Sequence, residues 1–356
     1  MMRKTIKMVG SANISPSDGH PYPVLRDSLG REGLTPTSDR NSEYFIAMNH
    51  NQKLYEDFIQ RGGQYERAVL IRLEPDSVFP LQYRASTLRK YGLVITPGSI
   101  LDRKSSRFFV GWPYQYNLNP TRPVNSDPSL QSVLENASWR DLFNVENWDS
   151  RPNILTMIAA NKVSPLKSAN YSLRRRLASE LPIEILEVYG PLWTDAIAAK
   201  AHHRLAVAVT NLRQGTVPNP VSLYGSLFRS YPTARGTVHD KHSVLRETKF
   251  SLVIENSNSY VSEKLIDAIV NGSIPIYVGP NLEKVGLPTE IAIHSSGDPK
   301  EVIEIVKALD SRSAETMLTA MREFLTSSLF LNFWTEQSVY ENISRQIAEY
   351  FRRLAE

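Results

Sequence analysis

Cysteine is absent from the 356 residues of the chain. Its absence excludes disulfide bonds, thiolate metal sites and cysteine nucleophiles, and it removes the usual mark of a small secreted scaffold. A chain without cysteine is typical of a reducing compartment. We therefore expect a cytoplasmic location.

Long apolar runs are also missing. No run approaches the ~20 residues of a membrane-spanning helix, and the first ten residues lack the apolar core of a signal peptide. The chain has no Gly-x-Gly-x-x-Gly loop, no Walker lysine loop and no Gly-x-Ser-x-Gly elbow. These absences argue against dinucleotide oxidoreductases, phosphate-loop enzymes and serine hydrolases.

The composition is that of an ordinary globular protein. Hydrophobic residues make up 41% of the chain and the net charge is +4. The basic residues are scattered, so the sequence does not favour a nucleic-acid partner, whereas small phosphate-bearing ligands remain compatible with it. A chain of 356 residues suits two α/β domains.

Strand-like and helical patterns divide the chain into two α/β halves. Apolar runs predict strands at 5–9, 44–48, 68–73, 93–96, 108–110 and 153–159, and periodicity predicts helices at 52–61 and 168–180. The turn-rich stretch 117–128 and Ser150-Arg151-Pro152 precede the strand at 153–159, which places a domain boundary near residue 150. We expect domains at 1–150 and 151–335. An amphipathic helix at 336–356 is predicted to pack across the domains, with peripheral membrane contact as the alternative.

Polar side chains are concentrated between two apolar strands at 249–280. A loop and the start of a helix there carry Glu255, Asn256, Ser257, Tyr260, Ser262, Glu263 and Lys264. Parallel α/β sheets bind ligands beyond their strand ends, and a helix start favours an anion. With Ser262 as the cap, Lys264 would bind phosphate and Glu263 would accept from two ribose hydroxyls. The alternative is a capped helix with solvated charges.

The same segment resembles the donor-binding motif of the α1,3-fucosyltransferase family. The similarity lies in Lys-Phe-Ser-Leu-x-x-Glu-Asn-Ser at 249–257, Tyr-Val-Ser-Glu-Lys at 260–264 and Gly-Ser-Ile-Pro-Ile-Tyr-Val-Gly at 272–279. Upstream, Tyr224-Gly225, the stretch 235–238 and Asp240-Lys241 are similar to what precedes this motif in the family. The family usually has Phe in place of Ile254, Thr in place of Ser262 and a longer loop.

The resemblance implies a GT-B fold, in which two Rossmann-like domains face each other across a cleft. It also implies an inverting enzyme that moves fucose from GDP-fucose to a saccharide hydroxyl, with the first domain on the acceptor side and Lys241 among the donor-binding residues. A different nucleotide sugar, or an inactive nucleotide-sugar or glycan-binding module, is the alternative.

Inverting transfer needs a carboxylate that takes the proton from the acceptor hydroxyl. Glu74 follows the apolar run 68–73, at the strand end where such sheets bind ligands. Its position resembles that of the Glu in the first-domain motif of the family. Asp76 is a second candidate, and a purely loop-capping role for Glu74 is the alternative.

A phosphate-binding cation is expected after the strand at 153–159. The resembled enzymes carry Ser-Asn and then an Arg there, and this chain has Ala160-Asn161 and then Lys167. Arg174 and Arg175 are alternatives to Lys167. Considered without the family, the run 174–176 is expected to form a solvated charged face.

No Asp-x-Asp motif occurs in the sequence. Such a motif marks metal-dependent donor binding in the other large glycosyltransferase architecture. We therefore predict no tightly held metal or cofactor, although a loosely bound divalent cation could help the diphosphate to leave.

Overall fold

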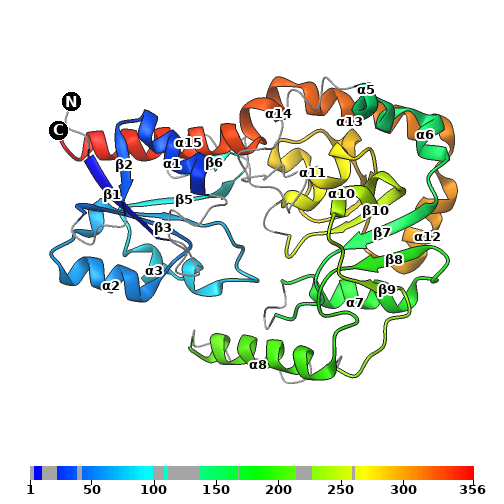
Figure 1. The fold of residues 1–356 in the computed structure, drawn as a ribbon, viewed down its shortest axis with the longest axis horizontal. Helices are drawn as coiled ribbons and strands as arrows, with labels where there is room; N and C mark the ends of the chain where they lie inside the picture. The colour runs from blue at the N-terminus through cyan, green and yellow to red at the C-terminus, as the bar shows by residue number, and fades with distance from the viewer. Residues whose placement is uncertain are drawn as a thin grey trace. The chain divides into compact units, whose positions relative to one another are not determined.

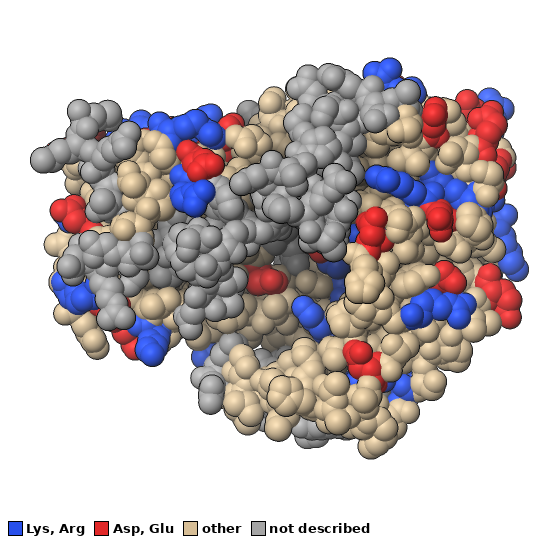
Figure 2. Space-filling view, in the orientation of Figure 1, with Lys and Arg blue, Asp and Glu red and all other residues tan. Residues whose placement is uncertain are grey.

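The structure, a computed structural model, describes most of the chain. The described residues are 4–9, 22–37, 42–98, 108–110, 137–164, 166, 168–213, 227–258 and 261–356. The chain forms two compact units, the first made of 1–115 with 328–356 and the second of 116–327. Each unit is a parallel β-sheet with helices packed on it (Figure 1). On the face drawn in Figure 2, cationic and anionic side chains are interspersed.

The sheet of the first unit has six parallel strands. They are β1 (Lys4–Val9), β2 (Leu34–Thr37), β3 (Tyr44–Met48), β4 (Ala68–Ile71), β5 (Leu93–Gly98) and β6 (Phe108–Val110), in the order β2-β1-β3-β4-β5-β6. Every residue of β3 and β4 is buried, as expected for strands covered on both faces. The five strands predicted in this half are confirmed, with ends that differ by one or two residues at most.

Strand β2 and the helix before it, α1 (Tyr22–Arg31), were not predicted. The sequence of β2 is Leu-Thr-Pro-Thr, and a proline weakens the pattern of a strand because it cannot donate to the ladder. Among the described strands β2 is at the edge of the sheet and pairs with β1 alone, and a proline is tolerated in such an edge strand.

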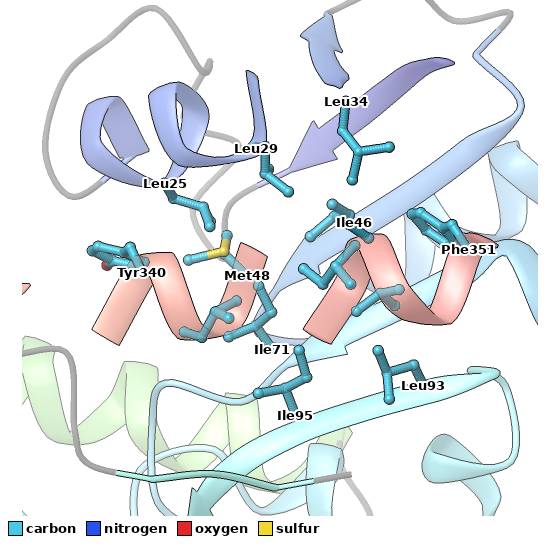
Figure 3. Close-up of a cluster of buried hydrophobic side chains, with 14 of the residues drawn as sticks. Leu25, Leu29, Leu34, Ile46, Met48, Ile71, Leu93, Ile95, Tyr340 and Phe351 are labelled. Carbon is cyan, nitrogen blue, oxygen red and sulfur yellow. The ribbon is translucent and has the colours of Figure 1, made fainter. Parts of the chain in front are cut away.

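Helices cover both faces of this sheet. Helices α2 (Gln52–Gln60) and α3 (Ala85–Leu88) pack on one face, where Tyr55 and Phe58 join a cluster with Phe45. Helices α1 and α15 (Glu336–Arg353) pack on the other face (Figure 3). Two short 3₁₀ segments, η1 (Tyr65–Arg67) and η2 (Pro80–Tyr83), and helix α14 (Ser328–Phe333) complete the unit.

Helix α15 is part of the first unit. Val339, Ile343 and Ile347 are fully buried in the cluster that contains Ile46 and Ile71. Tyr340 and Phe351 of the same helix and cluster are labelled in Figure 3. The apolar face of α15 is buried in the core of the first unit, so that face is unavailable to a lipid surface. Packing of this helix across the domains stays a prediction. The predicted division at 335/336 lies instead at 327/328, because α14 and α15 belong with the first sheet.

Among the described helices, none combines the length and apolarity needed to cross a bilayer.

Shortening a buried side chain of α15 should destabilise the first unit. We expect Ile343→Ala to cost about 2–5 kcal/mol of unfolding free energy, since it removes buried methyl groups and leaves a cavity. Leu354→Ala, at an exposed position just beyond the same helix, is the control and should change little. Urea unfolding of both variants measures the difference, and equal losses would contradict the packing described here.

The domain boundary predicted near residue 150 is wrong. The chain divides at 115/116, and α5 (Ala137–Arg140), η4 (Asp141–Phe143) and α6 (Val145–Asp149) belong to the second unit. Two buried indoles anchor them: Trp139 Nε1 donates to the carbonyl of Val270 at 2.9 Å, and Trp148 Nε1 donates to that of Lys249 at 2.8 Å. These contacts are between residues far apart in the sequence, so no local turn pattern marks the boundary.

The sheet of the second unit also has six parallel strands. They are β7 (Asn153–Ile158), β8 (Leu186–Tyr189), β9 (Ala234–Gly236), β10 (Thr248–Ile254), β11 (Ile274–Val278) and β12 (Ile293–His294), in the order β12-β11-β10-β7-β8-β9. Starting from β7, the first three strands run outward on one side and the next three on the other. This is the strand order of dinucleotide-binding sheets, which bind ligands where the order reverses, here between β7 and β10.

The helices of the second unit follow its strands. They are α7 (Tyr171–Glu180), α8 (Ile197–Arg213), α10 (Lys241–Arg246), α11 (Glu263–Val270), α12 (Pro299–Ala308) and α13 (Ser311–Thr326), with 3₁₀ segments η5 (Glu283–Val285) and η6 (Thr289–Ile291). The prediction of Rossmann-like α/β architecture in both halves of the chain is confirmed.

Candidate functional site

The predicted donor motif lies where the strand order of the second sheet reverses. Strand β10 ends at Ile254, the loop that follows begins at Glu255, and α11 begins at Glu263. Ser262 is the N-cap of α11, as predicted, and its side chain accepts from the backbone N–H of Lys264. The N-terminus of α11 therefore lies at the edge of the sheet where ligands bind in this fold.

Glu263 and Lys264 form a charged pair in the first turn of α11. Lys264 Nζ lies 2.9 Å from Ser262 Oγ and 3.3 Å from Glu263 Oε1, and its side chain is 19% exposed against 41% for Glu263. Burial raises the pKa of Glu263, but the ammonium groups of Lys264 and Lys241 outweigh this and hold that pKa at about 2. Glu263 is therefore an ionised, acceptor-only group at neutral pH, as a pair of ribose hydroxyls requires.

Glu255 closes the loop between β10 and α11. Its side chain is fully buried, and Oε1 accepts from the backbone N–H of Ser262 at 2.8 Å. Oε2 has no hydrogen-bond partner among the described residues. Burial raises the pKa of this carboxyl, and Lys264 offsets only part of the rise. A Cβ added to Gly279 would lie 2.4 Å from the Tyr277 hydroxyl oxygen and 2.8 Å from Glu255 Cγ, so these two side chains together leave room only for glycine.

The first residues of the loop are bound to the start of α7 and the residues just before it. The backbone N–H of Asn170 donates to the carbonyl of Asn256 at 2.9 Å, and Ala169 forms a β-bridge with Ser257. Arg174 Nη2 donates to the carbonyl of Ile254 at 2.5 Å and to Asn256 Oδ1 at 2.8 Å. The backbone positions of Asn256 and Ser257 are thus fixed by contacts from a second element.

The run of three arginines on α7 is not the solvated face that its sequence predicts. Arg174 is 2% exposed and Arg175 is 8% exposed, and Arg175 Nη1 donates to the carbonyl of Lys162 at 2.7 Å. Only Arg176 follows the prediction, since it forms exposed ion pairs with Glu180 and Asp298. The prediction failed because the carbonyl acceptors of the two buried guanidinium groups come from other segments of the chain.

Lys241 is bound to α11 rather than to the loop. It is the first residue of α10, and its Nζ lies 2.5 Å from Asp267 Oδ2, one helical turn beyond Glu263. Burial lowers the pKa of Lys241, but the carboxylates of Asp267, Glu263 and Asp240 together outweigh this and raise it. Lys241 therefore connects α10 to α11 and adds positive charge near Glu263. The other two predicted donor-binding residues, Lys167 and Tyr260, lie outside the described residues.

Glu74 lies in the first unit, three residues beyond the end of β4. Its backbone N–H donates to Asn49 Oδ1 at 3.0 Å, and its carbonyl accepts from Gln82 Nε2 at 2.7 Å and from Tyr83 OH at 3.0 Å. Burial raises the pKa of Tyr83 to about 12, so its hydroxyl keeps the proton that it donates. Three side chains therefore hold the backbone of one loop residue at the carboxyl edge of the first sheet.

Sequence reasoning missed the residues that hold Glu74. Asn49 directly follows β3, and its φ of 63° lies in the left-handed region that few residues other than glycine adopt. The sequence signal that could have identified Asn49 is an asparagine directly after a predicted strand, because asparagine tolerates this conformation.

Asp76, the second candidate base, accepts the N–H of Ser77 at 2.8 Å. Within the described ranges, no group of three or more acidic or histidine side chains is arranged to hold a metal ion.

Known proteins are similar to this chain around the same motif. Residues 193–319 match the family described as Glycosyltransferase family 10 (fucosyltransferase) C-term, a region that includes the loop after β10 and α11. The chain is 30% identical over 112 residues to an α-(1,4)-fucosyltransferase of Arabidopsis thaliana, which is 30% of this chain and 27% of that protein. It is 31% identical over 101 residues to human 4-galactosyl-N-acetylglucosaminide 3-α-L-fucosyltransferase 9, 26% of each chain. The chain thus matches about a quarter of the length of each of these relatives.

Solved structures match nearly the whole chain. An α1,3-fucosyltransferase gives a TM-score of 0.55 at 16% identity, covering 99% of this chain and 90% of that one. The Anabaena protein HepE in complex with UDP-glucose gives 0.52 at 11% identity, covering 98% and 99%. At these identities the likeness concerns the fold, which is GT-B. The chain has the GT-B fold, and its residues 193–319 are similar to the C-terminal region of the glycosyltransferase family 10 (fucosyltransferase).

Proposed function

We propose that the protein is an inverting glycosyltransferase that moves fucose from GDP-fucose to a saccharide hydroxyl. The observation that carries the proposal is the N-terminus of α11, where Ser262, Glu263 and Lys264 stand at the ligand-binding edge of a Rossmann-like sheet. This helix start lies in the region that matches the fucosyltransferase family. A crystal structure of an α1,3-fucosyltransferase with GDP-fucose shares the fold at a TM-score of 0.50.

Each residue has a chemical role in this proposal. The N-terminus of α11 and the Lys264 ammonium bind the diphosphate and stabilise the charge that it gains as it leaves. The ionised Glu263 carboxylate accepts hydrogen bonds from the ribose hydroxyls. Glu74 takes the proton from the acceptor hydroxyl as that oxygen attacks the sugar carbon from the face opposite the leaving diphosphate, which inverts the configuration. A loosely bound divalent cation would assist departure of the diphosphate.

A different nucleotide sugar is the second candidate donor. HepE in complex with UDP-glucose shares the fold at a TM-score close to that of the fucosyltransferase, so the fold does not discriminate between these donors. The loop after β10, rather than the fold, supports GDP-fucose, because it lies in the region of the family match.

Calorimetric titration of GDP, GDP-fucose, GDP-mannose, UDP and UDP-glucose tests the donor. We expect GDP and GDP-fucose to bind and the uridine nucleotides to bind far more weakly. Preference for a uridine nucleotide would overturn the fucose assignment, and binding without transfer to any saccharide in an acceptor screen would point to an inactive binding module. Repeating the transfer assay with Mg²⁺ and with a chelator measures the contribution of a cation.

A further inference from the structure

Arg72 is a half-buried cation at the carboxyl end of β4, which ends at Ile71. Its Nη2 donates to Thr96 Oγ1, on the neighbouring strand β5, at 2.5 Å. Its guanidinium carbon lies 4.1 Å from the ring centroid of Tyr83, the last residue of η2. Two other segments of the first unit therefore hold this guanidinium at the edge of the sheet where ligands bind in such folds.

The charge of Arg72 has no anionic partner among the described residues. Burial lowers the pKa of its guanidinium, and the one described group that raises this pKa is the phenol of Tyr83. Its Nε is buried and has no hydrogen-bond partner in the described part of the chain. Burying an unpaired charge or an unpaired donor costs free energy. An anionic group of a ligand would supply the partner that these residues do not.

Tyr83 connects this cation to Glu74, the candidate base. Its ring contacts the Arg72 guanidinium, and its hydroxyl donates to the carbonyl of Glu74 at 3.0 Å. Arg72 and Glu74 also lie only two residues apart in the segment that follows β4. The cation and the backbone of the candidate base are therefore both in contact with one tyrosine side chain. A saccharide whose hydroxyl reaches Glu74 is thus able to bring a second substituent to Arg72.

We propose that the acceptor is an acidic saccharide and that Arg72 binds its anionic group. The proposal rests on the proposed function, in which Glu74 takes the proton of the acceptor hydroxyl. A guanidinium suits this role because its fork of N–H donors matches the paired oxygens of a carboxylate or a sulfate. The diphosphate of the donor is assigned to Lys264 in the second unit, so Arg72 is not needed to neutralise it.

Matched acidic and neutral acceptors test the proposal on the wild type, with GDP-fucose as the donor. The acidic acceptors are oligosaccharides that carry a uronate, a sialate or a sulfate, and the neutral ones are the same compounds after carboxyl reduction or desulfation. We expect kcat/KM for the best acidic acceptor to fall by about tenfold to a hundredfold when its anionic group is removed, as when a charged hydrogen bond is lost. A loss on carboxyl reduction identifies a carboxylate, and a loss on desulfation identifies a sulfate.

Two other results of this screen would overturn the proposal. Equal or faster transfer to the neutral forms would show that Arg72 does not select an anion, and it would leave the proposed function in place. Transfer to no saccharide, acidic or neutral, would overturn the proposed function as well.

Arg72→Gln tests whether this residue is the source of the preference. In this variant the ratio of kcat/KM for the acidic acceptor to that for its neutral form should fall to about one, and Arg72→Lys, which keeps the charge without the fork, should retain part of it. An unchanged ratio would overturn the proposal, because it would mean that Arg72 has only a structural role. A tenfold loss of GDP affinity in calorimetry would also overturn it, because it would assign the cation to the donor diphosphate.

Arg67→Gln is the matched control, because it removes an arginine at the opposite end of β4. Arg67 lies over the ring of Tyr44 at 5.6 Å, much as Arg72 lies over that of Tyr83, but it is paired with Glu43 at 3.6 Å. Its ratio for acidic and neutral acceptors should equal that of the wild type, and a fall comparable to that in Arg72→Gln would overturn a specific role for Arg72. The comparison of acceptors in the wild type needs no variant, so it decides the proposal even if Arg72→Gln does not fold.

Discussion

Replacing Glu74 with glutamine should lower the rate of sugar transfer by about a hundredfold or more while leaving GDP affinity nearly unchanged. Glutamine has almost the same shape but cannot accept the proton of the acceptor hydroxyl. Asn49, Gln82 and Tyr83 hold residue 74 through its backbone N–H and carbonyl, which the substitution does not change, so the loop should keep its conformation. Steady-state kinetics with GDP-fucose, alongside GDP calorimetry, separates catalysis from binding.

Asp76→Asn is the companion variant. It alters a carboxylate two residues away whose Oδ1 caps the N–H of Ser77. A normal rate in Glu74→Gln together with a collapsed rate in Asp76→Asn would assign the base to Asp76. Normal rates in both variants would remove this loop from catalysis altogether.

Replacing Lys264 with alanine should weaken GDP binding by about tenfold to a hundredfold, because it removes a largely buried cation from the site proposed for the diphosphate. Guanosine carries no phosphate, so its binding should change much less. Calorimetry with both ligands measures this difference. The wild-type affinity for GDP should also fall as salt is added, more steeply than that of the variant.

Helix α12 offers a matched control for Lys264→Ala. Its N-cap, Asp298, accepts from the N–H of Lys300 just as Ser262 accepts from that of Lys264, but α12 follows β12 at the edge of the sheet. Lys300→Ala should therefore leave GDP affinity unchanged. A similar loss in both variants would mean that overall charge, rather than a site at α11, governs nucleotide binding.

Sequence patterns correctly predicted the helices and strands that are determined by residues close together in the sequence. Strand β3 is an uninterrupted apolar run, and α11 has a serine cap at its start, so both were predictable. The charged pair of Glu263 and Lys264 could be found for the same reason, since it belongs to that capped turn. These features depend on residues that are close together in the sequence.

Features that depend on distant contacts could not be predicted in this way. Arg174 is buried because carbonyl and amide oxygens some 80 residues later in the chain accept its hydrogen bonds. Trp139 and Trp148 donate hydrogen bonds to the carbonyls of Val270 and Lys249 in the second unit. Because of these contacts, the segment that contains the two tryptophans belongs to the second unit, and the boundary does not lie near residue 150. No periodicity or turn signal in the sequence records such pairings.

The position of α15 in the chain has a consequence for biosynthesis. Residues 336–353 complete the core of the first unit, but a ribosome makes them only after the whole of 116–327. The second unit is continuous, so it can fold as soon as it has left the ribosome. The first unit emerges earlier, but until α15 is made one apolar face of its sheet is covered by α1 without α15. A nascent chain of this kind exposes aggregation-prone strands during translation, and a chaperone that shields them should raise the yield of folded protein.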